Sequence, residues 1–398
     1  MTEPGSTRPL ADADGHDAAS APDPEDTGKI RGRAGFTASG AGIDHDVFLP
    51  ATAALRVIVI GVDFPDAPAD AVPGPDAEVA TYHDWLVPGG ARWLARSSGG
   101  RLHLAADTVA RWVRLSRSHE DYGFQRGIST QAHHAYIQEA VARAQDEADL
   151  SRYDLVYIVA PRSATGITFS PTWVDHRLHV EAGRHVVRHA VTFGQDMWRW
   201  GYKVLDHETG HTLGLPDLYH YRPPGDPPNA HYSVGGWDLM GLISGHAPEL
   251  LAWQKWRLGW LDDDQVAVVA PGSAMEVRLR PVETQGGRQL AVLPLGPGEA
   301  LMAECRRPVG NDEGARDQGV LVYRVNAAAG RGEGPSVRIL RRGGEPAFAP
   351  GDLDAACLRT DLGGAAACRL RDLPTGEEVE VAVLEHGRDG DLVRITRS

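Results

Sequence analysis

The stretch HETGHTLGLPDLY, residues 207–219, places two histidines four residues apart, with a glutamate directly after the first. Residues four apart lie one above the other on a helix, so His207 and His211 direct their imidazoles towards one point. Imidazole nitrogen is a common zinc ligand. Glu208 is rotated by about 100° from His207 around the helix, which places it beside the metal and outside the ligand set. The stretch therefore predicts a zinc site in which Glu208 is the general base.

The bare HExxH pattern has a second interpretation, in which two core histidines are satisfied by hydrogen bonds and the glutamate lies on a solvated face. With the histidine content of this chain, HExxH alone arises by chance in about one chain in twenty of this length. Gly214 and Asp217 extend the pattern to HExxHxxGxxD, which lowers that chance to roughly a few in ten thousand. The longer pattern favours the zinc interpretation.

Asp217 is the third zinc ligand that we expect. Gly214 allows a sharp turn where the helix stops, and Pro216 prevents the helix from resuming, so the chain carries Asp217 back towards the metal. Glu249 is the main alternative, because a glutamate on a later helix completes the site in thermolysin-type zinc enzymes. The other residues of the following stretch that can bind zinc are His220, Asp226, His231 and His246.

A methionine follows the site in the glycine-flanked stretch GGWDLMG, residues 235–241. Metzincins carry HExxHxxGxx(H/D) together with a methionine in a tight turn beneath the zinc, and Met240 fits that position. The alternative is that Met240 only fills a gap in the core, as methionines often do. We favour the Met-turn interpretation.

The first part of the chain alternates between strand-like and helix-like patterns. Continuous apolar runs predict buried strands at 54–64, 153–161 and 185–194, and apolar residues at helical spacing predict helices at 130–145 and 195–214. On the second helix Met197, Trp200, Val204, His207 and His211 share one face. The pattern predicts a mixed sheet with an active-site helix, in a domain of residues 46–262.

Beyond residue 262 the pattern changes to short alternating runs separated by Gly, Asp and Pro turns. These runs are 274–282, 288–295, 319–326, 379–387 and 391–397. Such runs are typical of a β-sandwich, and the GRDGD stretch before the last run is a hairpin signal. The fold class that we expect is therefore α+β, a metzincin-like zinc-peptidase domain followed by a β-sandwich domain at 263–398.

Composition excludes several classes of partner. The net charge is −14 and the basic residues form no dense run, which argues against nucleic acid. No apolar run approaches the roughly 20 residues needed to span a bilayer. Residues 1–45 are acidic and rich in Ala and Pro, so we expect a disordered tail, with an inhibitory pro-segment as the alternative. The tail shows no signal peptide, which on that basis predicts a cytoplasmic protein.

The three cysteines, Cys305, Cys357 and Cys368, are an odd number and cannot form a fully paired disulfide framework. Cys357 and Cys368 are close enough in sequence to pair across a short loop. Buried free thiols are the alternative.

With these motifs, the sequence resembles the immune inhibitor A family of bacterial zinc metallopeptidases. The resemblance rests on HETGHTLGLPDLY, on VGGWDLMG at 234–241 and on PELLAWQKWRLGWL at 248–261, which is similar to the helix that follows the family's Met-turn. It runs from about residue 54 to about residue 261, with VIVIGVDFPD at 57–66 similar to an early strand. It implies endopeptidase activity with a water nucleophile, His207, His211 and Asp217 as zinc ligands, and Glu208 as base.

Two features depart from the family. His220 stands where the family often has an acidic residue, so an auxiliary calcium ion is not supported here. The family is typically secreted with a signal and a sizeable propeptide, and neither is seen in this sequence. Export and latency are therefore not carried over by the resemblance.

We therefore predict a zinc-dependent endopeptidase that binds one catalytic zinc ion and acts on protein or peptide substrates. Tyr219 and Tyr232 are candidates to donate a hydrogen bond to the developing oxyanion, although packed tyrosines are equally common. Two alternatives stay open: a non-catalytic binding protein, with a structural or absent zinc and a ligand-binding β-sandwich, and a zinc hydrolase that acts on another kind of peptide. The sequence does not predict the oligomeric state.

Overall fold

A computed structural model describes the chain in two compact units. The described residues are 43, 46–71, 74–126, 128–174, 178–219, 233–270, 272–296, 298–326, 336–347, 350–360, 366–371 and 377–397. The predicted tail at 1–45 lies outside the described residues except for Ile43. The first unit comprises described residues of Arg56–Val87 and Ala106–Gly201, and the second comprises described residues up to Leu55, Pro88–Ala105, and those from Tyr202 onward.

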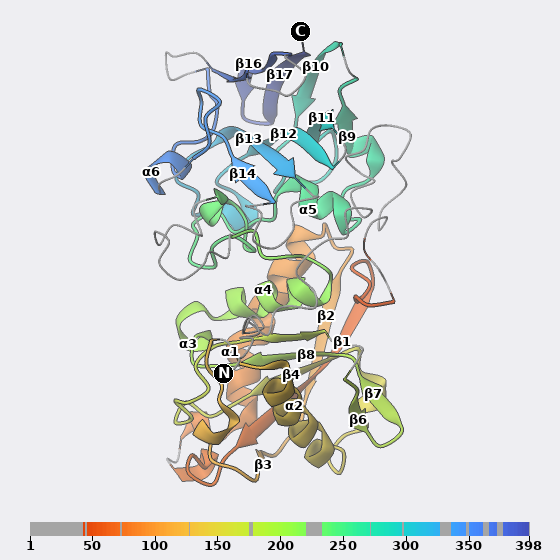
Figure 1. Ribbon diagram of the computed structural model, residues 1–398, viewed down its shortest axis with the longest axis vertical. Helices are drawn as coiled ribbons and strands as arrows, with labels where there is room; N and C mark the ends of the chain where they lie inside the picture. Colours follow the sequence, from red (N-terminus) through yellow and green to blue (C-terminus); the bar gives the residue numbers. More distant parts are fainter. Residues whose placement is uncertain are drawn as a thin grey trace, which may run out of the picture. The chain divides into compact units, whose positions relative to one another are not determined.

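The first unit is built around a largely parallel sheet (Figure 1). Its strands follow the order β2-β1-β4-β8-β5, with β3 pairing β1. Strands β1, β4 and β8 are parallel to one another, and β5 is antiparallel to β8. The elements that lie wholly or partly in this unit are β1 (Ala54–Asp63), α1 (Val79–Ser97), β2 (His103–Thr108), β3 (Val113–Arg114), α2 (Thr130–Ala144), β4 (Leu155–Val159), β5 (Thr172–Val174), β6 (Val180–Ala182), β7 (His185–Val187), β8 (His189–Phe193) and α3 (Met197–Trp200).

Burial explains why these segments form the central layer. Strands β4 and β8 are buried throughout, and β1 is buried over most of its length, as continuous apolar runs in a covered sheet require. Helix α2 is capped at its N-terminus by Ser129, whose hydroxyl accepts from the amide of Ala132. The helix packs its apolar face into the core to which Ile60 and Ile158 belong. The predicted strands at 54–64 and 153–161 and the helix at 130–145 are thus confirmed.

The predicted helix at 195–214 is wrong as one continuous element. It forms α3 and, after a break, α4 (Tyr202–Thr212). The break is at Gly201, whose φ of 57° is left-handed, a conformation that glycine adopts without a steric penalty. The histidines keep their common face because both lie in α4.

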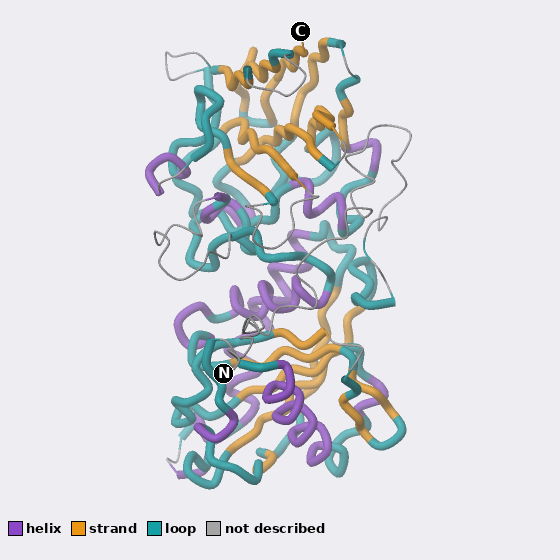
Figure 2. The backbone as a smooth tube through the Cα atoms, in the orientation of Figure 1, coloured by secondary structure: helices purple, strands orange, loops and turns teal. Residues whose placement is uncertain are grey.

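The second unit carries α4 and the C-terminal strands, and strands dominate its chain after residue 265 (Figure 2). One sheet has the order β10-β17-β16-β15 and the other β14-β13-β12-β11-β9. The two sheets share an apolar core that includes Val277, Leu301, Val322 and Val381. The elements are α5 (Ala252–Arg257), β9 (Val266–Val268), β10 (Ala274–Leu279), β11 (Leu290–Gly296), β12 (Glu299–Arg306), β13 (Gly319–Asn326), β14 (Val337–Ile339), α6 (Pro350–Leu353), β15 (Ala367–Leu370), β16 (Val379–Gly387) and β17 (Gly390–Arg397).

The expected α+β class is confirmed in its coarse form, because the chain combines several sheets with a few helices. The GRDGD stretch forms the predicted hairpin between β16 and β17, where Gly387 pairs with Gly390. A metzincin domain and a boundary at residue 262 stay predictions. By its contacts, however, α4 belongs to the same unit as the C-terminal sheets.

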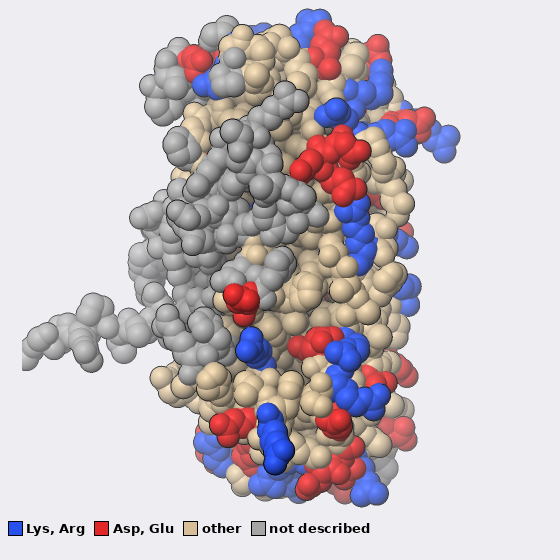
Figure 3. Space-filling model, turned by 90° about the vertical axis from the view of Figure 1, so that its right-hand side faces the viewer, with Lys and Arg blue, Asp and Glu red and all other residues tan. Residues whose placement is uncertain are grey.

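The cysteines and the surface complete the description. Cys305, Cys357 and Cys368 are free and buried, which is the second of the two interpretations that the sequence left open. Acidic and basic side chains are interspersed over the described residues on the face in Figure 3. No helix within the described part of the chain has the length and apolar character of a membrane span.

Candidate metal centre

Helix α4 brings the two histidines to the protein interior. Every residue from Val204 to Thr212 is buried. The helix ends at Thr212, two residues before Gly214, whose φ is 91°. The amide of Leu215 closes this end by donating to the carbonyl of Gly210 at 3.0 Å. The left-handed glycine thus reverses the chain immediately after His211, as the sequence predicts.

This reversal brings Asp217 to the histidines. Its Oδ1 atom lies 3.2 Å from Nε2 of His207 and 3.4 Å from Nε2 of His211. The three side chains are only 2–3% exposed. Zinc bonds of 2.0–2.1 Å in a tetrahedral arrangement require ligand atoms that are about 3.3 Å apart. The spacing of Asp217 from both imidazoles is therefore that of a zinc ligand set.

Backbone carbonyls fix the orientation of both imidazoles. Nδ1 of His207 lies 3.0 Å from the carbonyl oxygen of Leu239, and Nδ1 of His211 lies 2.8 Å from that of Leu215. Because a carbonyl only accepts, each Nδ1 carries the ring proton, which leaves the lone pair on Nε2 for a metal. Hydrogen bonds of this kind orient metal-binding histidines and raise their basicity.

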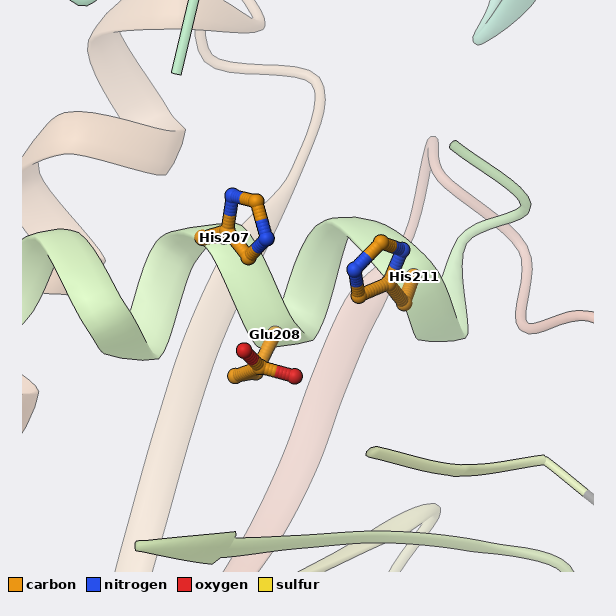
Figure 4. Close-up of side chains that lie close together, drawn as sticks. All are labelled: His207, Glu208 and His211. Atoms are coloured by element: carbon orange, nitrogen blue, oxygen red, sulfur yellow. The ribbon is translucent and has the colours of Figure 1, made fainter. Parts of the chain in front are cut away.

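Glu208 lies beside this ligand set. Potential ligand atoms of His207, Glu208 and His211 all fall within 4.8 Å of one another, and Glu208 is 4% exposed. In Figure 4 the Glu208 carboxylate lies away from the line that joins the two imidazole rings. This position allows the Glu208 carboxylate either to bind a metal together with the histidines or to accept a proton beside them, and its role as general base stays a prediction.

Met240 packs directly against α4. It is fully buried, and its carbonyl accepts from the amide of Leu218 at 2.9 Å, next to Asp217. A Cβ atom added at Gly210 would lie 2.9 Å from the Met240 sulfur, so glycine is needed where this side chain meets the helix. Met240 thus packs against the helix that carries both histidines, and the Met-turn interpretation stays a prediction.

Electrostatics couples Asp217 with the two histidines. Burial raises the pKa of Asp217, but the imidazoles of His211 and His207 outweigh it and hold that pKa well below its usual range. Burial lowers the pKa of His211, and the Asp217 carboxylate more than offsets this, so that the pKa lies above its ordinary value. A carboxylate anion and two imidazoles in a buried cluster form a donor set that suits a divalent cation such as zinc.

Glu249, the main alternative to Asp217 as third ligand, forms hydrogen bonds with other residues. The Glu249 carboxylate accepts from the Ser97 hydroxyl, from the Asn311 amide at 3.1 Å and from the Leu250 backbone amide at 2.9 Å. Lys255 lies 3.7 Å away. Glu249 therefore belongs to a buried polar network with Ser97, Asn311 and Lys255.

The structure describes only some of the other candidate residues. His246 is exposed, and Tyr219 is partly buried next to Leu218. His220, Asp226, His231 and Tyr232 lie outside the described residues. An oxyanion role for either tyrosine stays a prediction.

Substitution of Gly214 by alanine is expected to impair both folding and metal binding. A side chain at φ 91° is strained by about 1–3 kcal/mol, and its Cβ would lie 2.9 Å from Ile43 Cγ2. Relief of this strain should move Asp217 and weaken zinc binding. Urea unfolding and zinc competition assays measure the two effects. Gly123→Ala is the control, because Gly123 has a φ of 63° with nothing near the added Cβ; equal zinc affinities in the two variants would contradict the expectation.

Acid is expected to release the metal. Protons and zinc compete for the Nε2 lone pairs, so zinc affinity should fall as the pH falls. Because Asp217 raises the pKa of His211, the fall should begin above the ordinary histidine pKa of about 6.5. Zinc dissociation constants measured between about pH 8 and pH 5 test this. Full zinc retention after dialysis at about pH 4 would argue against histidine ligands.

Sequence patterns missed the groups that support the ligands. The roles of the Leu239 and Leu215 carbonyls cannot be predicted from residue type, because any residue can supply a backbone oxygen. Arg306 donates to the carbonyl of Trp237, three residues before Met240, and lies about 100 residues after α4 in the sequence. Its supporting role is seen only in the structure, where its side chain is fully buried. No protein-family model matches the chain, and no curated protein is significantly similar to it.

Proposed function

We propose that the chain is a zinc-dependent endopeptidase. One observation carries the proposal: Asp217 Oδ1 lies 3.2 and 3.4 Å from the two histidine Nε2 atoms, with the Glu208 carboxylate beside them. Three protein ligands with a neighbouring carboxylate are typical of catalytic zinc sites, which keep a position for water or substrate. A metzincin-type domain and the resemblance to immune inhibitor A peptidases are part of this proposal.

Each residue then has a distinct task. Bound zinc would supply a Lewis acid that polarises the scissile carbonyl and lowers the pKa of water. Glu208 accepts the proton of the attacking water and returns it to the leaving amine. His207, His211 and Asp217 hold the ion, and the carbonyls of Leu239 and Leu215 keep the imidazoles in the binding tautomer.

A non-catalytic protein with a structural zinc is supported less well. Structural zinc is usually enclosed by four protein ligands, often cysteines. Here the three cysteines are buried apart from the cluster's ligand set, and Cys305 instead lies 3.5 Å from Asp391. Within the described residues, three side chains converge with ligand spacing.

A cavity next to the Met240 segment suits part of a peptide. It has a volume of about 200 Å³, and Trp237, Leu242 and Leu353 supply apolar walls. An ion pair between Arg316 and Asp354 at 2.7 Å borders it. A cavity of this size and lining accepts one apolar side chain. We propose that this cavity receives a substrate side chain, so that cleavage products share an apolar residue at a fixed position from the cut.

Peptide-library cleavage followed by mass spectrometry tests the proposed function. Internal cuts are expected from the zinc-loaded protein and are expected to disappear with a chelator. The Glu208→Gln protein, prepared in parallel, controls for a contaminating peptidase. Library peptides that stay intact with the zinc-loaded protein would refute the proposal.

A further inference from the structure

Arg306 is a fully buried arginine at the end of strand β12, in the same compact unit as α4. Its guanidinium donates to three backbone carbonyls in the segment that contains Met240. The oxygen atoms belong to Trp237 at 3.0 Å, Glu249 at 3.2 Å and Ala247 at 3.4 Å. One side chain thus holds both ends of the loop from 237 to 249.

Acidic side chains keep this guanidinium charged. Asp312 accepts from Nε at 2.8 Å, Glu304 accepts from a terminal nitrogen at 2.9 Å, and Glu283 lies 3.3 Å away. A charge without partners would be costly at full burial, and these carboxylates offset that cost. The carbonyl contacts are therefore made by a charged donor, which forms stronger hydrogen bonds than a neutral one.

Asp238 closes the same loop from within. Its carboxylate accepts from the amide of Met240 at 2.7 Å and from that of Leu251 at 2.8 Å. Leu239 lies between Asp238 and Met240, and its carbonyl accepts the hydrogen bond from Nδ1–H of His207. Arg306 and Asp238 thus fix the backbone on which one imidazole depends.

We propose that Arg306 is a positioning residue for the metal centre: it clamps the 237–249 loop and so sets the Leu239 carbonyl that orients His207. Strand β12 then supports the metal centre through Arg306, its last residue. The catalytic consequence rests on the proposed peptidase function, whereas the consequence for zinc binding does not.

Arg306→Lys tests the clamp, with Arg307→Lys as the matched control. Arg307 is the next residue and is also buried, but its side chain donates to Asp391 at 2.6 Å, to the Gly387 carbonyl at 2.7 Å and to the Arg306 carbonyl at 2.9 Å. Among the described residues, none of these bonds reaches the 237–249 loop. Lysine keeps one charge but cannot reach three carbonyls at once. Zinc affinity is measured by chelator competition, together with the melting temperature, kcat, KM and the downfield proton signal of imidazole Nδ1–H.

We expect Arg306→Lys to weaken zinc binding about 10-fold or more, as loss of groups that orient metal ligands does. The His207 Nδ1–H signal should shift or broaden, and kcat should fall more than KM changes. Arg307→Lys should lower the melting temperature with zinc affinity within about twofold of the parent. A lower melting temperature with unchanged zinc affinity and an unchanged Nδ1–H signal in Arg306→Lys would overturn the proposal.

Asp312→Asn is the second variant, in case Arg306→Lys does not fold. It retains the guanidinium but removes the negative charge that pairs with it at Nε. The amide oxygen of asparagine can still accept from the Glu249 amide, as Asp312 Oδ1 does at 2.8 Å. A smaller loss of zinc affinity, about threefold, is expected in the same direction. Unchanged zinc affinity in a folded Asp312→Asn protein would overturn the proposal. If zinc binding changes as expected while no variant or parent cleaves peptides, the peptidase proposal fails and the clamp stands.

Discussion

Glu208→Gln is expected to retain one zinc ion per chain and to lose peptidase activity by a factor on the order of 100 or more. Glutamine keeps the shape of the side chain but cannot accept a proton at neutral pH. The ligand spacing of His207, His211 and Asp217 does not involve the Glu208 carboxylate. Zinc content measured by atomic emission and kcat measured on a quenched peptide give the two quantities.

Glu208→Asp is the matched control for this experiment. Aspartate keeps the acid–base group but shortens its reach by one methylene, so its activity should lie between those of the parent and the glutamine variant. Near-normal cleavage by zinc-loaded Glu208→Gln would remove Glu208 from the role of base. Loss of zinc from Glu208→Gln would instead make Glu208 a ligand.

Asp217→Ala is expected to lose both zinc and activity. Loss of groups that merely orient a ligand already weakens zinc binding about 10–100-fold, so loss of a ligand itself should cost more than about 100-fold. The change also removes the negative charge that raises the pKa of His211, which should then fall towards or below its ordinary value. Zinc affinity by chelator competition is the direct measurement.

Glu249→Gln separates the two candidates for the third ligand. Glutamine retains an oxygen for the Ser97 hydroxyl and the Leu250 amide but weakens the pairing with Lys255. We expect a less stable protein with parental zinc affinity. If Asp217→Ala keeps tightly bound zinc while Glu249→Gln loses it, the assignment of the third ligand is wrong.

The cluster of His207, His211 and Asp217 was predictable because its geometry is local. His207 and His211 are one helical turn apart, and a left-handed Gly214 followed by Pro216 determines how the chain returns to Asp217. The break at Gly201 was not predictable in the same way, because an apolar helical pattern continues across it. Local periodicity does not reveal a glycine that adopts a positive φ.

The surroundings of the cluster depend on contacts that are remote in sequence. Arg306 reaches Trp237 across 69 positions, and Ser97 reaches Glu249 across 152. Sequence patterns do not encode which buried charges meet, because many pairings of Arg, Glu and Asp satisfy the same composition. The resemblance implies a helix within 248–261, and the helix in the structure is shorter, covering Ala252–Arg257. Just before it, the amides of Glu249 and Leu251 donate to the side chains of Asp312 and Asp238.

Zinc titration of the metal-free protein, followed by the rate of cleavage of an internally quenched peptide, tests the central claim most directly. The rate should be near zero after chelation, rise in proportion to added zinc and level off at one ion per chain. A protein that binds one zinc per chain with no gain in cleavage, or that cleaves equally well without zinc, would contradict a peptidase built on His207, His211 and Asp217.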